Sequence, residues 1–396
     1  MQNNIAIIVS TYNRPDSLHR LLMSLSGSDY SGYTDIPLII SIDKNNDNSC
    51  LRIAKEFIWN FGKKEIIEQE NLLGLKNHIL SCGDLTQRFD GLILLEDDLL
   101  VSSGFYDFAQ QSFTFYKDDL NVAGIGLYAN CFNETAYCTF DPIEDGFDNY
   151  FMQVPCSWGQ LWTKRQWQGF RNFIEDSKLI LNELQLPETV ASWSDSTSWK
   201  KIFYKYLIAN NLYFVYPRVG FSTNYAEPGS HIKEPVTVFQ ANLLLNKKEM
   251  RFSSFHQSVS IYDAYFEFTT LAYQRFSGKK IDVSFDLNGT KPLREIQSEY
   301  LISSKLTSDP EIIYDSRLYP YENNVLLEML SSDISNSFIL AKTKSFSEKN
   351  RFQRTDADIR KYFISKEILI QKLAIRKTTF FTNAISFLKT ILSSKK

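Results

Sequence analysis

The 396-residue sequence predicts an α/β fold built on a mostly parallel β-sheet. Short apolar runs rich in β-branched residues alternate with segments whose apolar residues follow helical spacing. Such alternation is typical of parallel strands joined by helices that cover both faces of the sheet. The composition agrees, because 43% hydrophobic and 22% charged residues are ordinary for a globular chain and exclude a disordered one.

Five apolar runs have the length and composition of buried strands. They are residues 5–10, 37–42, 65–68, 91–95 and 122–127. The segments between them carry apolar side chains at helical spacing, and Asp16 or Ser17 can cap the first of these helices. We expect helices over residues 18–25, 51–61, 75–85 and 105–116. Strand and helix therefore alternate through the first 130 residues.

The pattern loosens after about residue 130. Helices are still predicted over residues 164–174 and 197–210, and a short strand over 213–216. Beyond these segments there are no repeats and no clear period, and we expect an α-rich C-terminal extension. The predicted parts are a first domain over 1–240, an extension of unknown role over 241–355 and a tail over 356–396.

The N-terminus, the cysteines and the net charge limit the class of protein. The apolar run at the start is too short for a signal peptide or a membrane-spanning helix. The five cysteines contain no C-x-x-C pair, which argues against a zinc site or a disulfide framework. A formal charge of −3 argues against a nucleic-acid partner. A cytoplasmic protein with reduced thiols is expected.

Polar side chains follow three of the predicted strands at their carboxyl ends, where ligands bind in open α/β sheets. They are Ser10, Thr11, Arg14, Asp43, Glu96, Asp97 and Asp98. Three consecutive carboxylates repel one another, and a divalent cation relieves that repulsion. Hard oxygen ligands suit Mg²⁺ or Mn²⁺, which commonly also bind substrate phosphates. A solvated acidic turn is the alternative.

Other segments give weaker indications. The G-x-G-x-x-A pattern at 124–129 precedes a loop-like sequence, which argues against a dinucleotide site. The chain contains neither a P-loop pattern nor G-x-S-x-G. Asp195 precedes a predicted helix, so it either caps that helix or acts as a general base. His231 follows a turn-forming Pro-Gly-Ser, where it is either a surface residue or a metal ligand.

Taken in order, these segments resemble GT-A glycosyltransferases. Residues 8–15, Ile-Val-Ser-Thr-Tyr-Asn-Arg-Pro, are similar to the opening of large bacterial family 2 transferases. Later segments resemble the N-acetylglucosaminyltransferase I family in its E-D-D, P-G-L-G-W-type, W-D-D, R-P-E-I-S-R-T and G-V-S-H segments. The matching positions are 96–98, 155–159, 193–195, 216–223 and 228–231. The resemblance covers about residues 5 to 240.

The resemblance implies a Rossmann-like GT-A domain and a role for each matching residue. Arg14 and Asp43 would hold the nucleotide, Asp43 at the uracil, and Asp98 would ligate the metal. Asp195 would be the catalytic base. The other donor-binding positions are Ser10, Thr11, Asn77, Glu96, Asp97 near the ribose, and Ser230 in a loop over the diphosphate. Trp158, Gly159 and Trp193 would lie on the acceptor or sugar side, and His231 would be a second metal ligand.

Two departures from the family pattern leave the sugar and the acceptor open. Ser194 stands where the family has the first Asp of W-D-D, and Cys156 and Ser157 interrupt the glycine-rich segment. The reaction class is not affected. It would be the inverting transfer of a sugar from a nucleotide-diphosphate donor, a UDP-sugar, to a glycan or lipid-linked acceptor in bacterial surface-polysaccharide synthesis.

Two other functions stay open. A nucleotidyltransferase also uses acidic metal sites, although its usual Gly-rich loop after the first strand is absent from residues 11–15. A non-catalytic nucleotide-sugar-binding protein would keep the fold without the chemistry. For an enzyme, Mn²⁺ or Mg²⁺ would stabilise the leaving diphosphate, and a carboxylate would take the proton of the acceptor hydroxyl.

The last 41 residues differ from the rest in charge. They carry nine Lys or Arg and three Asp or Glu, a net charge of +6, which leaves −9 on the rest of the chain. From Phe380 to Leu392 the apolar residues follow helical spacing, so this is a basic amphipathic segment. It either packs on the domain or binds an anionic membrane surface, which would place the protein peripherally on the inner face of the membrane.

Overall fold

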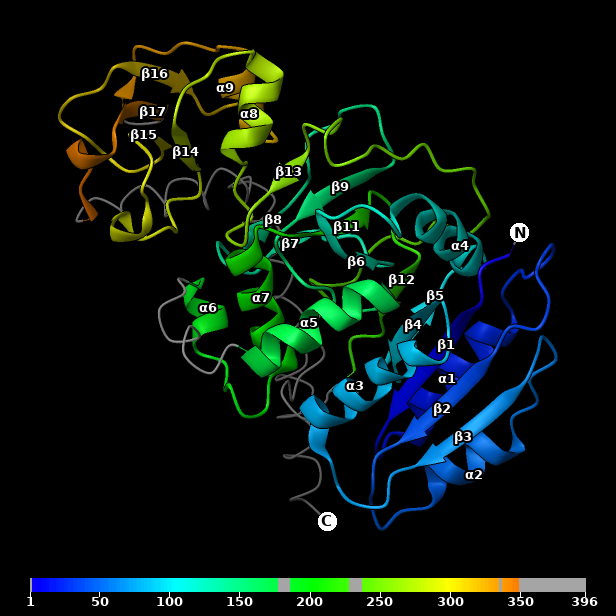
Figure 1. Ribbon diagram of the computed structural model, residues 1–396. Helices are drawn as coiled ribbons and strands as arrows, with labels where there is room; N and C mark the ends of the chain where they lie inside the picture. The colour runs from blue at the N-terminus through cyan, green and yellow to red at the C-terminus, as the bar shows by residue number, and fades with distance from the viewer. Residues whose placement is uncertain (1, 177–185, 228–236, 335–336, 349–396) are drawn as a thin grey trace, which may run out of the picture.

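The computed structural model describes residues 2–176, 186–227, 237–334 and 337–348. Its centre is a nine-stranded sheet (Figure 1). Across the sheet, the strands are β13 (Ile261–Tyr262), β9 (Asn149–Met152), β11 (Tyr213–Pro217), β6 (Val122–Gly126), β10 (Gln160–Thr163), β4 (Gly91–Glu96), β1 (Ile5–Thr11), β2 (Leu38–Ile42) and β3 (Lys64–Glu68). All run in one direction except β9, β10 and β13. The predicted α/β class with a mostly parallel sheet is confirmed.

Strands β1 to β4 form the continuous parallel half of the sheet. Burial on both faces explains why β1, β2 and β4 consist of aliphatic runs instead of alternating patterns, whereas the edge strand β3 is only partly buried and carries charged residues. In the register, Ser10 of β1 lies opposite both Ser41 of β2 and Glu96 of β4. The carboxyl ends of three strands therefore meet at one edge, with the polar residues that follow them.

Helices cover both faces of the sheet, as expected. One face carries α1 (Pro15–Ser26), α2 (Ser49–Glu56) and α4 (Phe105–Tyr116), and the other carries α3 (Gly74–Asp84), α5 (Lys164–Asp176) and α7 (Trp199–Asn210). On the first face, the ring of Tyr30 packs against Trp59 and Phe105 at centroid distances of 5.4 and 6.1 Å. On the second, Trp162 of β10 lies fully buried against Trp167 of α5.

Strand β10 is one of the elements that the sequence pattern did not predict. It runs antiparallel between β4 and β6 and joins the two halves of the sheet. The turn before it contains Gly159, whose φ of +91° is a conformation that side chains rarely adopt. A Cβ atom there would also lie 2.7 Å from the hydroxyl of Ser222. Glycine is therefore required where this loop approaches β12 (Ser222–Asn224).

Shorter elements complete the part of the chain that borders the site. Strand β5 (Leu99–Val101) follows the acidic triplet and pairs antiparallel with β12. A hairpin of β7 (Phe132–Asn133) and β8 (Cys138–Thr139) and the short helix α6 (Glu188–Ala191) lie near the amino end of α7. A 3₁₀ turn, η1 (Leu85–Gln87), leads into β4.

The C-terminal extension contains a second sheet of four strands, where we expected an α-rich segment. Its order is β14 (Val283–Asp286), β15 (Tyr300–Ser303), β17 (Ser337–Lys342) and β16 (Ile312–Asp315). Helices α8 (Thr270–Ser277) and α9 (Glu322–Leu326) and the turns η3 (Leu293–Glu295) and η5 (Thr343–Ser345) accompany it. The strands have four to six residues, too few to give a period in the sequence.

The expected division of the chain at residue 240 stays a prediction. The edge strand β13 of the nine-stranded sheet comes from residues 261–262, which we assigned to the extension. The expected tail over 356–396 lies outside the described residues. Within the described ranges, no helix combines the length and the apolar character that crossing a membrane requires.

Glu322, at the start of α9, is a buried carboxyl group. Only 8% of the residue is exposed, and burial raises the pKa of its carboxyl to about 7. The folded state therefore holds this proton more tightly than the unfolded chain does. The free energy of unfolding falls as the pH rises from the unfolded pKa toward the folded one.

We expect Glu322→Gln to remove this part of the pH dependence. The raised pKa of Glu322 corresponds to about 3 kcal/mol of unfolding free energy, which the wild-type protein loses between pH 4 and pH 8. Urea unfolding at a series of pH values measures it. Glu299→Gln, at an exposed glutamate in the same part of the chain, is the control, and its unfolding free energy should change with pH as in wild type. The same wild-type pH dependence in Glu322→Gln would show that Glu322 is not the titrating group.

Candidate active site

The acidic triplet and the polar residues after β1 meet at the carboxyl edge of the sheet, as the sequence predicts. The guanidinium group of Arg14 forms ion pairs with Asp97 and Asp98, and its Nη1 lies 2.9 Å from Asp98 Oδ2. The hydroxyl of Thr11 donates to Asp97 Oδ2 at 2.7 Å. Residues from two separate strand ends thus form one charged cluster around the guanidinium group of Arg14.

The cluster has more negative than positive charge. Burial, together with the charges of Asp98 and Asp97, raises the pKa of Glu96 to about 8. Burial also raises the pKa of Asp97, although Arg14 and Thr11 counteract it. One guanidinium group does not neutralise three carboxylates, so a proton is retained at neutral pH. A further cation is the electrostatic complement of this site.

Of the carboxylates in this cluster, the side chain of Asp98 is the one placed to bind a divalent cation. Among the described residues, no group of three or more His, Cys, Asp or Glu side chains is placed to hold a metal ion. Asp97 Oδ1 is buried against Arg14 without hydrogen-bond geometry, whereas the side chain of Asp98 is 26% exposed. Asp98 can therefore serve as one carboxylate ligand, with the remaining positions left to substrate oxygens and water, as is usual for Mg²⁺.

Asp43 follows β2 and is almost completely buried, with 3% exposure. Its two carboxylate oxygens accept hydrogen bonds from the backbone N–H groups of Lys44, Leu73 and Gly74, each at 2.9 Å. Asp43 therefore holds the loop that begins α3 against the end of β2. Its expected contact with a uracil stays a prediction. That contact would use the lone pairs of the carboxylate oxygens that the three backbone N–H groups do not occupy.

His78 is a site residue that the sequence analysis missed. Its Nδ1 lies 3.3 Å from the hydroxyl of Ser10, and its Nε2 lies 2.8 Å from the hydroxyl of Ser41. Burial lowers the pKa of His78, so the ring stays neutral and links the ends of β1 and β2 to α3. Its neighbour Asn77, the expected nucleotide contact, donates to the carbonyl of Leu73.

The expected base, Asp195, lies before α7 with a side chain that is 60% exposed. Its carboxylate oxygens are 3.3 Å from Lys201 Nζ and 2.8 Å from Lys205 Nζ. The bond to Lys205 is the main reason for the lowered pKa of Asp195. Asp195 does not cap the helix, because Ser198 accepts the hydrogen bond from Lys201 N. Its role as a base stays a prediction.

Two tryptophans of the expected sugar side lie together near the start of α7. Trp158 packs against Tyr128 with ring centroids 4.8 Å apart, and the hydroxyl of Ser222 donates to its carbonyl. Trp193 lies 6.1 Å from the ring of Tyr204. Both indoles are half-buried, and the ammonium group of one lysine, Lys200, lies 5.4 Å from the centroid of each. The sequence analysis did not single out this lysine.

Ser230 and His231 lie outside the described residues, which omit 228–236. The chain that leads to them passes the acidic cluster, because Tyr225 N donates to the carbonyl of Asp98 at 3.0 Å. Glu227 then accepts hydrogen bonds from Ser17 and Arg20 of α1. The described part of this segment therefore borders the charged cluster.

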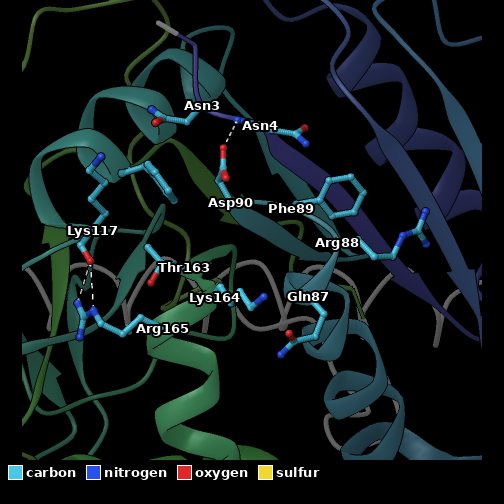
Figure 2. Close-up of a pocket in the computed structure, with 11 residues that line it drawn as sticks. Asn3, Asn4, Gln87, Arg88, Phe89, Asp90, Lys117, Thr163, Lys164 and Arg165 are labelled. Carbon is cyan, nitrogen blue, oxygen red and sulfur yellow. Dashed lines mark hydrogen bonds between the residues drawn. The ribbon is translucent and has the colours of Figure 1, made fainter.

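A separate pocket lies at the opposite edge of the sheet, near the amino ends of β1 and β4 (Figure 2). Asp90 accepts a hydrogen bond from Asn4 N there, and Arg165 donates to the carbonyl of Lys117. Ligands of open α/β sheets bind at the carboxyl ends of strands, so this basic pocket is not the expected active site.

Comparison with known proteins gives structural neighbours only. No protein-family model and no curated protein matches the sequence. S. aureus TarS 1-349 in complex with UDP-GlcNAc is similar at 13% identity and a TM-score of 0.37, over 58% of this chain and 60% of that one. Mannosyltransferase PcManGT from Pyrobaculum calidifontis, in complex with GDP-Man and Mn²⁺, matches at 11% identity and a TM-score of 0.30, over 42% and 46%.

This chain spans less than two thirds of either neighbour's length. Both TM-scores are below 0.5.

Removing Arg14 should make the stability of the protein depend on divalent cations. In Arg14→Gln the three carboxylates lose their shared cation, and we expect a loss of about 1–3 kcal/mol. Millimolar Mg²⁺ should restore part of it, because the ion binds the folded cluster and not the unfolded chain. Thermal unfolding with and without Mg²⁺ measures the effect.

Arg88→Gln is the matched control, since Arg88 pairs with Glu65 away from this site. That variant should show no added response to Mg²⁺. An equal response of both variants would mean that the carboxylates after β4 do not attract the ion.

Proposed function

We propose that this protein is a glycosyltransferase that uses a divalent cation and a nucleotide-diphosphate sugar, a UDP-sugar. The observation that carries the proposal is the cluster of Arg14 with Asp97 and Asp98 at the carboxyl edge of the sheet. It offers a carboxylate for a cation and a guanidinium group for phosphate oxygens. A diphosphate is the ligand whose charge distribution requires both.

In this proposal, donor binding rearranges the cluster. Asp98 would hold Mn²⁺ or Mg²⁺, which supplies Lewis-acid stabilisation of the diphosphate when bound. Arg14 would turn from Asp98 to the diphosphate oxygens, since one guanidinium group cannot serve both. The hydroxyl of Thr11 keeps Asp97 in place during this exchange. The protein thus exchanges internal ion pairs for equivalent pairs with the ligand.

The chemical step is a single displacement at the anomeric carbon. The acceptor oxygen forms its bond to that carbon as the bond to the diphosphate oxygen breaks, and the configuration inverts. Asp195 takes the proton of the acceptor hydroxyl. Its ion pairs with Lys201 and Lys205 occupy one direction at each oxygen, and the 60% exposure of the side chain leaves room for a hydroxyl.

Non-catalytic binding of a nucleotide sugar is the second candidate. It is favoured by one observation, the lowered pKa of Asp195, which makes this carboxylate a weaker base than a free one. Turnover of the donor separates the two functions, because a binding protein would hold the nucleotide sugar without releasing the diphosphate.

The biosynthetic process, the transferred group and the cellular location are proposed from the sequence. The resemblance to bacterial family 2 transferases supports surface-polysaccharide synthesis and transfer of a hexosyl or N-acetylhexosaminyl group. The basic amphipathic segment 356–396 supports peripheral binding to the inner face of a membrane, where a lipid-linked acceptor would lie.

Asp98→Asn should uncouple cation binding from nucleotide binding. In the wild-type protein we expect Mn²⁺ to raise the affinity for UDP about tenfold or more, because Asp98 would hold the ion and the ion would supply positive charge to the diphosphate. The variant should bind UDP equally with Mn²⁺ and with EDTA in isothermal titration calorimetry. Asp90→Asn, at the opposite edge, should behave like wild type. A full Mn²⁺ effect in Asp98→Asn would overturn the metal role of Asp98.

Asp195→Asn should keep donor binding and lose turnover. We expect the slow release of UDP from UDP-glucose or UDP-N-acetylglucosamine, with water as acceptor, to fall about 10²–10⁴-fold. Coupled detection of UDP measures the rate, and UDP titration measures binding. Ser194→Ala, whose hydroxyl contacts only Ser196 among the described side chains, is the control. An equal loss of UDP binding in Asp195→Asn would assign a structural role to this carboxylate.

A further inference from the structure

Two buried lysines of α7 hold the loop that precedes this helix. The side chains of Lys201 and Lys205 are only 9% and 5% exposed. Because they lie four residues apart, both extend from the same face of the helix. Both ammonium groups reach the carboxylate of Asp195, the expected base, in the loop between α6 and α7. This carboxylate therefore joins the loop to successive turns of α7.

Lys201 anchors the loop through three acceptors. Its Nζ donates to the carbonyl of Ala191 at 2.9 Å, to that of Trp193 at 2.6 Å and to Asp195 Oδ2 at 3.3 Å. An ammonium group has three N–H donors, so all of them have acceptors here. Ala191 is the last residue of α6. One buried cation thus fixes the end of α6, the middle of the loop and one oxygen of the expected base.

Lys205 differs from Lys201, because among the described residues its ammonium group has Asp195 as its acceptor and no other. Its Nζ lies 2.8 Å from Asp195 Oδ1. Within the described ranges, no second carboxylate lies at ion-pair distance from either lysine. A buried ammonium group without a counter-charge is costly, so protonation of this carboxylate would be unfavourable. The hydrogen bond with Lys205 accordingly lowers the pKa of Asp195.

The other charged groups around Asp195 do not replace Lys205. Lys76 of α3 donates to the backbone carbonyl of Asp195 at 2.8 Å and not to its carboxylate. Lys200 of α7 pairs instead with Glu134 of the β7–β8 hairpin, at 3.7 Å. The carboxylate of Asp195 thus has two buried ammonium partners on one side, and the exposed remainder of the side chain is open to an acceptor hydroxyl.

We propose that Lys201 and Lys205 are positioning residues for this base, Lys201 by fixing its loop and Lys205 by keeping its carboxylate ionised. The inference rests on the proposed function, in which Asp195 takes the proton of the acceptor hydroxyl. Misplacing a reacting group by about 1 Å can cost about 10²-fold in rate, so a loop anchor contributes to catalysis without touching the substrate. The proton that Asp195 takes then passes to water, which Lys205 favours because its charge disfavours the protonated carboxyl group.

Two measurements separate the roles of the two lysines. The first is the rate of UDP release from a UDP-sugar, with water as acceptor, followed across pH by ion-exchange chromatography. The second is carbon-13 NMR of the Asp195 carboxyl group, which follows its titration directly and does not require activity. Its resonance is the one that Asp195→Asn lacks. Calorimetric titration with UDP and Mn²⁺ gives the affinity for the nucleotide in each variant.

In Lys205→Met we expect the NMR midpoint of Asp195 and the acidic limb of the rate profile to move together to higher pH. The ammonium group lowers the pKa of this carboxyl in the folded protein, so its removal raises that pKa. At neutral pH the rate should change less than about threefold, because Asp195 is ionised in both proteins and Lys201 still holds the loop. Lys205→Arg keeps the cation and should stay closer to wild type.

In Lys201→Met we expect the rate to fall about tenfold or more at every pH, because the loop loses its anchor. The affinity for UDP should change less than about twofold, since neither lysine belongs to the cluster around Arg14. Lys279→Met is the control. It removes an exposed ion pair with Glu328 in the C-terminal extension and should behave like wild type in all three measurements.

An unchanged NMR midpoint of Asp195 in folded Lys205→Met, with wild-type circular dichroism, would overturn the inference for Lys205. A wild-type rate in folded Lys201→Met would overturn it for Lys201. A loss of UDP affinity as large as the loss of rate would assign the lysines a purely structural role. If wild type releases no UDP, the proposed function fails, whereas the NMR midpoint still decides whether Lys205 keeps the carboxylate ionised.

Discussion

The interaction on which the site depends is the ion pairing of one guanidinium group with consecutive carboxylates. Arg14 enters from the loop after β1, and Asp97 and Asp98 enter from the turn after β4. They meet because β1 and β4 are parallel neighbours, with Ser10 opposite Glu96. Without a cation, the three acidic groups would repel one another at a buried strand end. The cluster holds the turn in place and remains short of positive charge, and in the proposed function a cation and a diphosphate would bind there.

The rest of the fold places other groups around this cluster. The antiparallel strand β10 begins after Gly159, so Trp158 lies close to the end of β4 and to the start of α7. Helix α7 then brings Lys200 to the same side, where its charge acts on Glu96.

Much of the first half of the fold could be predicted from the sequence, because buried parallel strands are aliphatic runs and their helices have regular spacing. The predicted helix over 105–116 has the same bounds as α4. Strand β10 could not be predicted, since four residues buried on both faces show no period. The cluster around Arg14 follows from the rule on strand ends, whereas the partners of His78 come from two strands that only the fold brings together. Lys200 has no distinguishing mark in a helix rich in lysine, and the rings around it come from segments that only the fold brings together.

The most direct test of the central claim is the product released from nucleotide sugars. The full chain would be incubated with Mn²⁺ and UDP-glucose, UDP-N-acetylglucosamine, UDP-galactose or GDP-mannose, and the nucleotides would be separated by ion-exchange chromatography. The account predicts release of UDP from at least one UDP-sugar and its loss in EDTA. Release of UMP or pyrophosphate would contradict it, as would intact donors under every condition.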